Sequence, residues 1–215
     1  LRSDKHMEKL RHCVIFGAGK YDSFPPFIPE GALVIAADAG LKKCEEYGIS
    51  PDMVLGDFDS LGSVPDAGNV VLLPVEKDVT DTFAAVEAGQ KAGCNSFFIY
   101  GGMGGRPDHS AANYALCASL SRDGIHCSLF GDGYEVTAVT NGKTELHGSV
   151  GDTVSVFSFT EKSIGVTYTG LKYSLNGAVL DCFFALGVSN EFSEEQATVE
   201  VKNGTLLVMR ERKSR

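Results

Sequence analysis

The feature that most constrains the fold is an alternation of short apolar runs with segments of helical length between residues 11 and 130. The runs are bounded by Gly, Pro, Asp or Asn and lack alternating polarity, which is typical of strands buried on both faces. The expected strands are residues 13–16, 32–36, 53–55, 70–73, 97–100 and 127–130. The expected helices are residues 40–47, 80–92 and 108–122. Such alternation predicts a largely parallel sheet covered on both faces.

The pattern changes after about Tyr134. Valines at 154, 156, 199 and 201 alternate with polar residues, and Asn-Gly pairs at 141–142 and 203–204 predict β-hairpins. We therefore expect an α/β fold with a mostly parallel, Rossmann-like N-terminal domain at residues 7–140. An antiparallel β-sandwich domain should follow at residues 141–215. Residues 1–6 resemble a vector remnant ahead of a native Met7.

Composition and charge narrow the classes of function. A net charge of −9 argues against nucleic acid as the main partner, because phosphate backbones select basic surfaces. The sequence contains neither an apolar run long enough to span a membrane nor a secretory signal pattern. The six cysteines form no C-x-x-C pair, which disfavours a zinc site or a disulfide framework. Buried free thiols in a reducing cytoplasm are the expected state.

Carboxylates follow two neighbouring expected strands. Asp57 and Asp59 come directly after the strand at 53–55, and Asp38 closes the strand before it. In open α/β sheets, ligands bind outside the carboxyl ends of the strands. Two close carboxylates repel each other unless a cation or a proton lies between them, and such hard oxygen ligands suit Mg²⁺. An ordinary turn also explains this stretch, since Asp, Ser and Gly are turn residues.

Two later loops lead from strand to helix at the same edge. In the first, Lys77 could meet phosphate oxygens and Asp81 could reach the metal, although a helix-capping role for Asp78 or Thr80 is also plausible. The second, residues 101–109, is rich in glycine, so its backbone can approach a ligand closely. It also carries a phosphate-binding candidate, Arg106, and two residues that either cap the helix or take part in the chemistry, Asp108 and His109.

Other signals are weaker. The chain contains no G-x-x-x-x-G-K-[ST] loop, and Gly17-Ala18-Gly19 lacks the third glycine of a dinucleotide fingerprint. Loops after Gly170 and Gly187 carry Tyr173, Ser189 and Asn190. They are either plain sandwich connections or a site where Tyr173 stacks on an aromatic ligand.

Together these stretches resemble the thiamine pyrophosphokinase family. The matching motifs are residues 48–52 running into 56–60, Lys77-Asp78-x-Thr80-Asp81, Gly101-Gly102 with residues 105–109 and Ala112-Asn113, and the loops at 170–175 and 189–191. They occur in family order across residues 11–210.

The resemblance implies a homodimer whose active site lies where the subunits meet, and which moves diphosphate from ATP to thiamine with Mg²⁺, giving thiamine diphosphate and AMP. It assigns the metal to Asp57, Asp59 and Asp81. The nucleotide and phosphate region is assigned to Asp38, Lys77, Gly102, Arg106, Asp108, His109 and Asn113, with Asp108 as a candidate proton acceptor. The thiamine loops, carrying Tyr173, Ser189 and Asn190, are expected to come from the partner subunit.

One segment departs from the family pattern, and two alternatives remain. Residues 38–42 read Asp-Ala-Gly-Leu-Lys where the family usually has Asp-Gly-Gly-Ala-Asn, so Ala39 should restrict the backbone and an asparagine contact is lost. The first alternative is a phosphatase of the haloacid dehalogenase type, with Asp57 as nucleophile. The second is a nucleotide sensor that has lost turnover.

Overall fold

The computed structural model describes residues 10–23, 25–56, 70–72 and 79–212. The first half of the chain contains β1 (His12–Phe16), β2 (Leu33–Ala37), α1 (Gly40–Tyr47), β3 (Met53–Gly56), β4 (Val70–Leu72), α2 (Asp81–Lys91), β5 (Ser96–Tyr100), α3 (Pro107–Arg122) and β6 (His126–Gly131). The second half contains β7 (Tyr134–Thr140), β8 (Lys143–His147), β9 (Thr153–Ser158), β10 (Lys162–Thr169), β11 (Leu175–Asp181), β12 (Asn190–Glu191), β13 (Gln196–Glu200) and β14 (Thr205–Glu211).

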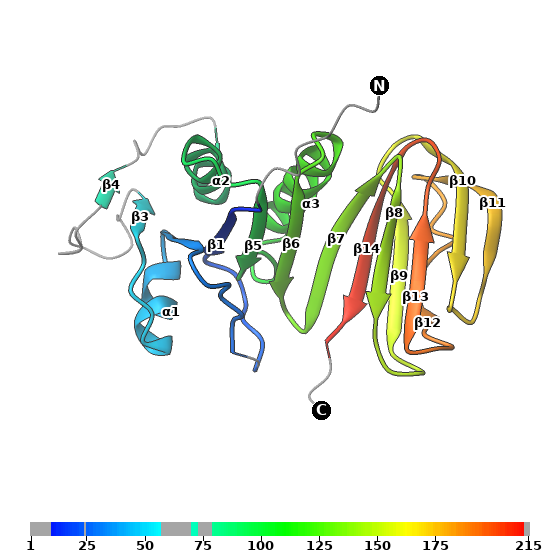
Figure 1. The fold of residues 1–215 in the computed structure, drawn as a ribbon, viewed down its shortest axis with the longest axis horizontal. Helices are drawn as coiled ribbons and strands as arrows, with labels where there is room; N and C mark the ends of the chain where they lie inside the picture. The colour runs from blue at the N-terminus through cyan, green and yellow to red at the C-terminus, as the bar shows by residue number, and fades with distance from the viewer. Residues whose placement is uncertain (1–9, 24, 57–69, 73–78, 213–215) are drawn as a thin grey trace, which may run out of the picture.

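The described strands form one long sheet and one short sheet (Figure 1). The long sheet has the order β12-β9-β14-β7-β6-β5-β1-β2-β3-β4, and the short sheet has the order β11-β10-β13-β8. Strands β1 to β6 pair in parallel, whereas β7 and every later pairing are antiparallel. The expected fold class, an α/β part followed by an antiparallel β-sandwich, is confirmed.

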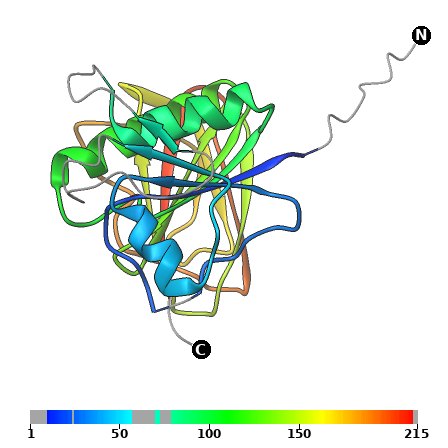
Figure 2. The same cartoon turned by 90° about the vertical axis from the view of Figure 1, so that its left-hand side faces the viewer.

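The parallel part reverses direction between β1 and β5. The chain moves outward from β1 through β2 and β3 to β4, then returns to β5 and β6 on the other side of β1. Helices α2 and α3 cover one face and α1 covers the other (Figure 2). The crevice outside the carboxyl ends of β1 and β5 is therefore the place where an open sheet of this kind binds ligands.

The apolar side chains of the central strands explain the two covered faces. Ile15 and Phe97 belong to the cluster beneath α2 and α3, whereas Val14 and Phe16 belong to the cluster beneath α1. Neighbouring residues of a strand point to opposite faces, so a continuous apolar run fills both clusters. This is why the sequence shows no alternation in these strands.

The sandwich shares the long sheet with the α/β part. Its core lies between the short sheet and the outer strands of the long sheet, and includes Val156, Phe192, Val199 and Leu206. The alternating valines thus point inward, and the polar residues between them face outward.

The two Asn-Gly pairs do not form the expected hairpins. Asn141-Gly142 joins β7 to β8, and Asn203-Gly204 lies between β13 and β14; each pair of strands belongs to two different sheets. The two turns instead bond to each other, because Gly204 N donates to Asn141 Oδ1 at 2.9 Å and Asn141 N donates to Gly204 O at 3.1 Å. The local turn signal is correct, but a second sheet takes up the outgoing strand.

Within the described residues, we find no helix with both the length and the apolar character needed to cross a membrane. All six cysteines are free; five are buried and Cys182 is exposed.

Candidate active site

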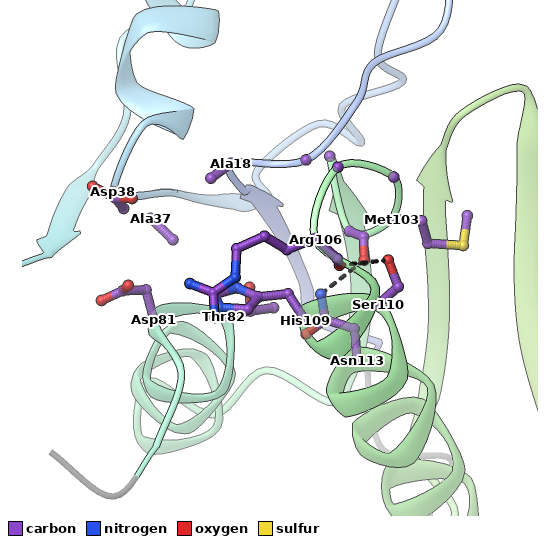
Figure 3. Close-up of a pocket in the computed structure, with 15 residues that line it drawn as sticks. Ala18, Ala37, Asp38, Asp81, Thr82, Met103, Arg106, His109, Ser110 and Asn113 are labelled. Atoms are coloured by element: carbon purple, nitrogen blue, oxygen red, sulfur yellow. Dashed lines mark hydrogen bonds between the residues drawn. The ribbon is translucent and has the colours of Figure 1, made fainter. Parts of the chain in front are cut away.

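A pocket of about 360 Å³ lies at the reversal point of the sheet (Figure 3). Its walls come from the ends of three strands and the starts of two helices. The lining residues are Ala18, Gly19, Ala37, Asp38, Asp81, Thr82, Gly101 to Arg106, His109, Ser110 and Asn113. Six of the predicted nucleotide and metal residues are among them: Asp38, Asp81, Gly102, Arg106, His109 and Asn113.

Two glycine-rich loops form one wall of the pocket. Gly19 N donates to Gly101 O at 2.9 Å, and Lys20 N donates to Met103 O at 2.8 Å. A Cβ atom on Gly19 would lie 2.5 Å from the carbonyl oxygens of both Gly101 and Met103. Only glycine permits this close approach, so Gly19 is needed for the packing of these two loops. Unlike the loop of a dinucleotide fingerprint, the loop after β1 leads to β2 without a helix among its described residues.

Asn113 and Gly102 hold the second loop in place. The buried Asn113 side chain donates from Nδ2 to Gly102 O at 2.8 Å, and Gly102 N donates to Phe130 O at 3.1 Å. Both residues were predicted as ligand contacts. They line the pocket, and their hydrogen bonds also fix the shape of the loop around it.

Arg106 and Asp108 form a two-pronged ion pair at the start of α3. Arg106 Nε lies 3.1 Å from Asp108 Oδ1, and Nη2 lies 2.6 Å from Oδ2. Asp108 Oδ1 also accepts a hydrogen bond from His109 N at 3.0 Å. Arg106 lines the pocket, whereas Asp108 does not. Asp108 thus orients the guanidinium and does not provide the helix cap, since Arg106 occupies the N-cap position.

The pKa of Asp108 argues against a role as proton acceptor. The hydrogen bond from Arg106 is the main reason that this pKa falls from 3.8 to about 2, and the His109 amide lowers it further. A carboxylate that holds a proton so weakly is a poor base at neutral pH. The geometry favours a positioning role for Asp108.

We expect a carbon-13 NMR titration of the Asp108 carboxyl to give a midpoint near 2, which is below the ordinary value of 3.8. Because the folded-state pKa is depressed, the ion pair contributes stability above about pH 4, and this contribution is lost as the pH falls through about 2. In an Arg106→Met variant the midpoint should move back towards 3.8, and the signal should be absent from Asp108→Asn. An unchanged midpoint in Arg106→Met would contradict the ion pair.

The backbone of residues 38–40 shows what the departure from the family pattern changes. Asp38 has φ of 51°, a left-handed conformation that Asp tolerates better than most residues. Ala39 has φ of −60° and ψ of −10°, so alanine is unstrained there and the expected restriction has no cost. Gly40 is the residue that cannot change, because a Cβ atom would lie only 1.9 Å from Phe16 O.

Asp81 is the first residue of α2, which Thr80 caps by accepting a hydrogen bond from Phe83 N at 3.2 Å. In Figure 3, Asp38 and Asp81 lie at the same end of the pocket. The described residues contain no group of three His, Cys, Asp or Glu side chains that could hold a metal. Asp57, Asp59, Lys77 and Asp78 lie outside the described residues, so the set Asp57, Asp59 and Asp81 stays a prediction.

The predicted thiamine residues lie in a separate group. Asn190 is buried, accepts a hydrogen bond from Tyr173 N at 3.0 Å and donates one to Tyr173 O at 2.8 Å. Its amide therefore fixes the backbone of Tyr173, a residue that is 61% exposed. Ser189 precedes it with φ of 57°. Tyr173 and Ser189 are exposed and can present a surface to a ligand, whereas Asn190 is buried.

One chain does not bring this group to the pocket. Asn190 lies on β12, and β9, β14, β7 and β6 separate β12 from β5 in the long sheet. With strands about 4.8 Å apart, Asn190 is roughly 24 Å from the strand that leads into the glycine-rich loop. Neither Tyr173 nor Ser189 nor Asn190 lines the pocket.

Two lining residues with polar side chains, Thr82 and Ser110, were not predicted. They lie in the first turns of α2 and α3 and face the pocket beside Asp81 and His109. The signal that could have identified them is their position, because a helix that starts at the ligand edge exposes its first turn there.

Two family models match the chain. Residues 24–129 match the catalytic domain of thiamin pyrophosphokinase, and residues 143–206 match the vitamin B1 binding domain of thiamin pyrophosphokinase. A curated relative, thiamine pyrophosphokinase from Bacillus subtilis (strain 168), is 26% identical over 191 residues, which span 86% of this chain and 89% of the relative.

Solved structures share the fold. Thiamine pyrophosphokinase from B. subtilis has a TM-score of 0.84 at 24% identity, covering 95% of this chain and 100% of that chain. Thiamin pyrophosphokinase from Candida albicans has a TM-score of 0.75 at 14% identity, covering 94% and 89%. The structural likeness supports the fold, and the two family models together span most of the sequence. The chain therefore belongs to the thiamine pyrophosphokinase family.

Proposed function

We propose that this protein transfers diphosphate from ATP to the hydroxyethyl group of thiamine, giving thiamine diphosphate and AMP. The observation that carries the proposal is the pocket at the reversal point of the sheet, in a chain that belongs to this family. Two glycine-rich loops bring backbone groups close to the cavity, and Arg106 adds a guanidinium group beside them. These are groups that bind a chain of phosphates.

Positioning and charge neutralisation account for most of such a transfer, because the protein has little covalent chemistry to perform. Arg106, oriented by Asp108, is suited to grip phosphate oxygens. Thr82, His109 and Ser110 line the same space and can donate hydrogen bonds. Holding the two reactants in line can contribute on the order of 7–11 kcal/mol to lowering the barrier.

Mg²⁺ is the cofactor that fits the donors at one end of the pocket. Asp38 and Asp81 offer hard carboxylate oxygens there, and Mg²⁺ is usually held by one or two carboxylates together with substrate phosphates and water. We assign the ion to Asp81 together with Asp57 and Asp59, and a phosphate contact to Lys77. When bound, the ion would offset phosphate charge and stabilise the leaving AMP.

A homodimer would complete the site. Because roughly 24 Å separate β12 from β5, the loops carrying Tyr173 and Ser189 cannot serve the pocket of their own chain. We propose that they reach the pocket of the partner subunit, where the Tyr173 ring stacks on thiamine. Exposed apolar side chains beside these loops, including Phe183 at 88% and Phe184 at 68%, are consistent with a covered surface. The free cysteines fit a cytoplasmic location.

The direct test is to incubate the purified protein with ATP, Mg²⁺ and thiamine and to quantify the products. We expect AMP and thiamine diphosphate in equal amounts, with no AMP when thiamine is omitted. A sensor would bind ATP without forming AMP, which would contradict the proposal.

The haloacid dehalogenase alternative makes a different prediction. It requires a phosphoenzyme on Asp57 and release of inorganic phosphate from a monoester. It also leaves residues 143–206, which match a vitamin B1 binding domain, without a role. Trapping a phosphorylated Asp57 would favour it over diphosphate transfer.

A further inference from the structure

The segment between β1 and β2, residues 17–32, forms part of the pocket wall but contains no helix in its described residues. We call it the β1–β2 loop. Parallel strands are usually joined by a helix, which packs on the sheet and fixes the crossover. Since the β1–β2 loop lacks one, its position depends on the contacts that its residues make elsewhere.

An ion pair between a buried carboxylate and a partly buried guanidinium holds this loop near its start. The Asp22 side chain is only 4% exposed, and its Oδ2 lies 2.7 Å from Nη1 of Arg212, which is 21% exposed. Asp22 Oδ1 accepts a hydrogen bond from Gly133 N at 2.7 Å, and Arg212 N donates to Gly133 O at 2.8 Å. The Arg212 guanidinium also lies 4.9 Å from the centre of the Phe130 ring. These contacts join the β1–β2 loop, the turn between β6 and β7, and the residue that follows β14.

The same loop contacts the pocket three residues earlier. Gly19 lines the cavity and bonds to Gly101, and Lys20 bonds through its backbone to Met103. Few dihedral angles separate these residues from Asp22, so a shift of Asp22 would displace the pocket wall. The other ion pair of this stretch, Lys20 with Asp132, has side chains 59% and 55% exposed. Exposed pairs contribute little, whereas breaking a buried pair is strongly unfavourable.

We propose that Asp22 and Arg212 are positioning residues for the nucleotide pocket: their largely buried pair ties the residue that follows β14 to the loop whose Gly19 forms the pocket wall. The inference rests on the proposed function only in taking the ligand of this pocket to be a nucleotide. Neither residue touches the cavity. Arg212 also lies beyond the last paired residues of β14 and β7, Glu211 and Tyr134, so its replacement removes no pair from the sheet.

The test compares Arg212→Gln, Asp22→Asn and the double variant with the full-length wild type. Binding of a non-hydrolysable ATP analogue, measured by calorimetry with Mg²⁺, should weaken about tenfold in each single variant, which corresponds to roughly 1.4 kcal/mol. The double variant should be no worse than the singles, because both remove one interaction. Arg212→Lys, which keeps the charge, should restore part of the affinity.

Two further readouts separate positioning from general loss of structure. Hydrogen exchange should speed up at the amides of Gly19 and Lys20, which bond to the second loop, and not in the sandwich core at Val199. The KM for thiamine should stay within about twofold of the wild-type value, because the loops that carry Tyr173 and Ser189 lie near β11 and β12, away from the β1–β2 loop. Lys20→Gln is the matched control: it removes the exposed pair of the same loop and should bind the nucleotide as the wild type does.

The outcomes are distinct. Wild-type affinity and exchange in folded Arg212→Gln and Asp22→Asn would overturn the inference and leave the proposed function intact. If the wild type itself fails to bind the ATP analogue, the proposed function fails as well. If Arg212→Gln does not fold, Asp22→Asn decides: unchanged binding and unchanged exchange at Gly19 in that folded variant overturn the inference, and weaker binding with faster exchange supports it.

Discussion

Replacing Asp81 with asparagine should lower the rate of thiamine diphosphate formation by on the order of 10²- to 10³-fold, the size of effect known for loss of one preorganised electrostatic group from an active site. Asp81 lies at the end of the pocket where Asp38 also lies, and asparagine keeps its shape but not its charge. The interaction of this carboxylate with the start of α2 is worth about 0.3–1 kcal/mol, so the helix should still form in the variant. Product formation across a Mg²⁺ titration, with urea unfolding alongside, measures both effects.

The neighbouring residue supplies the control for this prediction. Thr80→Ala removes the cap that bonds to Phe83 N and should cost about 1 kcal/mol of unfolding free energy. It retains the Asp81 carboxylate, so most of the activity should remain. Asp81→Asn should therefore lose turnover and keep most of its stability, whereas Thr80→Ala should lose stability and keep most of its turnover. Near-normal turnover in Asp81→Asn at low Mg²⁺ would show that this carboxylate does not serve the metal.

Mixed dimers of Asp81→Asn and Tyr173→Ala chains should show more activity at limiting thiamine than the average of the two variants measured separately. If the site combines the pocket of one chain with the thiamine loop of the other, half of the sites in a mixed dimer are intact. Random mixing in a two-fold dimer then restores about a quarter of the wild-type rate. Tyr173→Ala alone should lose the stacking energy of the ring on thiamine, roughly 1–3 kcal/mol, measured as a fall in kcat/KM for thiamine. Its exposed ring leaves no cavity when removed, so the chain should fold.

The control for this experiment mixes two variants that both damage the nucleotide pocket. Asp81→Asn with Arg106→Met should show no recovery, because every arrangement of these chains leaves at least one damaged pocket group in each site. Mixing is carried out by co-expression with two affinity tags, and mass spectrometry confirms the mixed dimer. Absence of recovery in verified mixed dimers of Asp81→Asn and Tyr173→Ala would contradict a site shared between subunits.

Much of the candidate site followed from the sequence because its residues lie at or just beyond the ends of strands. Asp38 directly follows β2, Gly102 and Arg106 lie in the loop between β5 and α3, and the carboxyl ends of parallel strands meet at one edge. Asp108 was predicted at the same edge, but its carboxylate points to Arg106, a choice between local partners that residue type alone does not decide. For Asn190, the sequence indicated a ligand contact, and the fold gave its amide to the backbone of Tyr173.

The sequence by itself determined the elements of the α/β part. The helix expected at residues 80–92 is α2 at Asp81–Lys91 with Thr80 and Ala92 as its caps, because apolar content and capping are local properties. Only the tertiary structure decided which strands share a sheet, so the Asn141-Gly142 turn joins two sheets. It also decided that Asp22 meets Arg212 across 190 positions of sequence. Contacts of this kind depend on how the elements pack, and a local pattern does not record that.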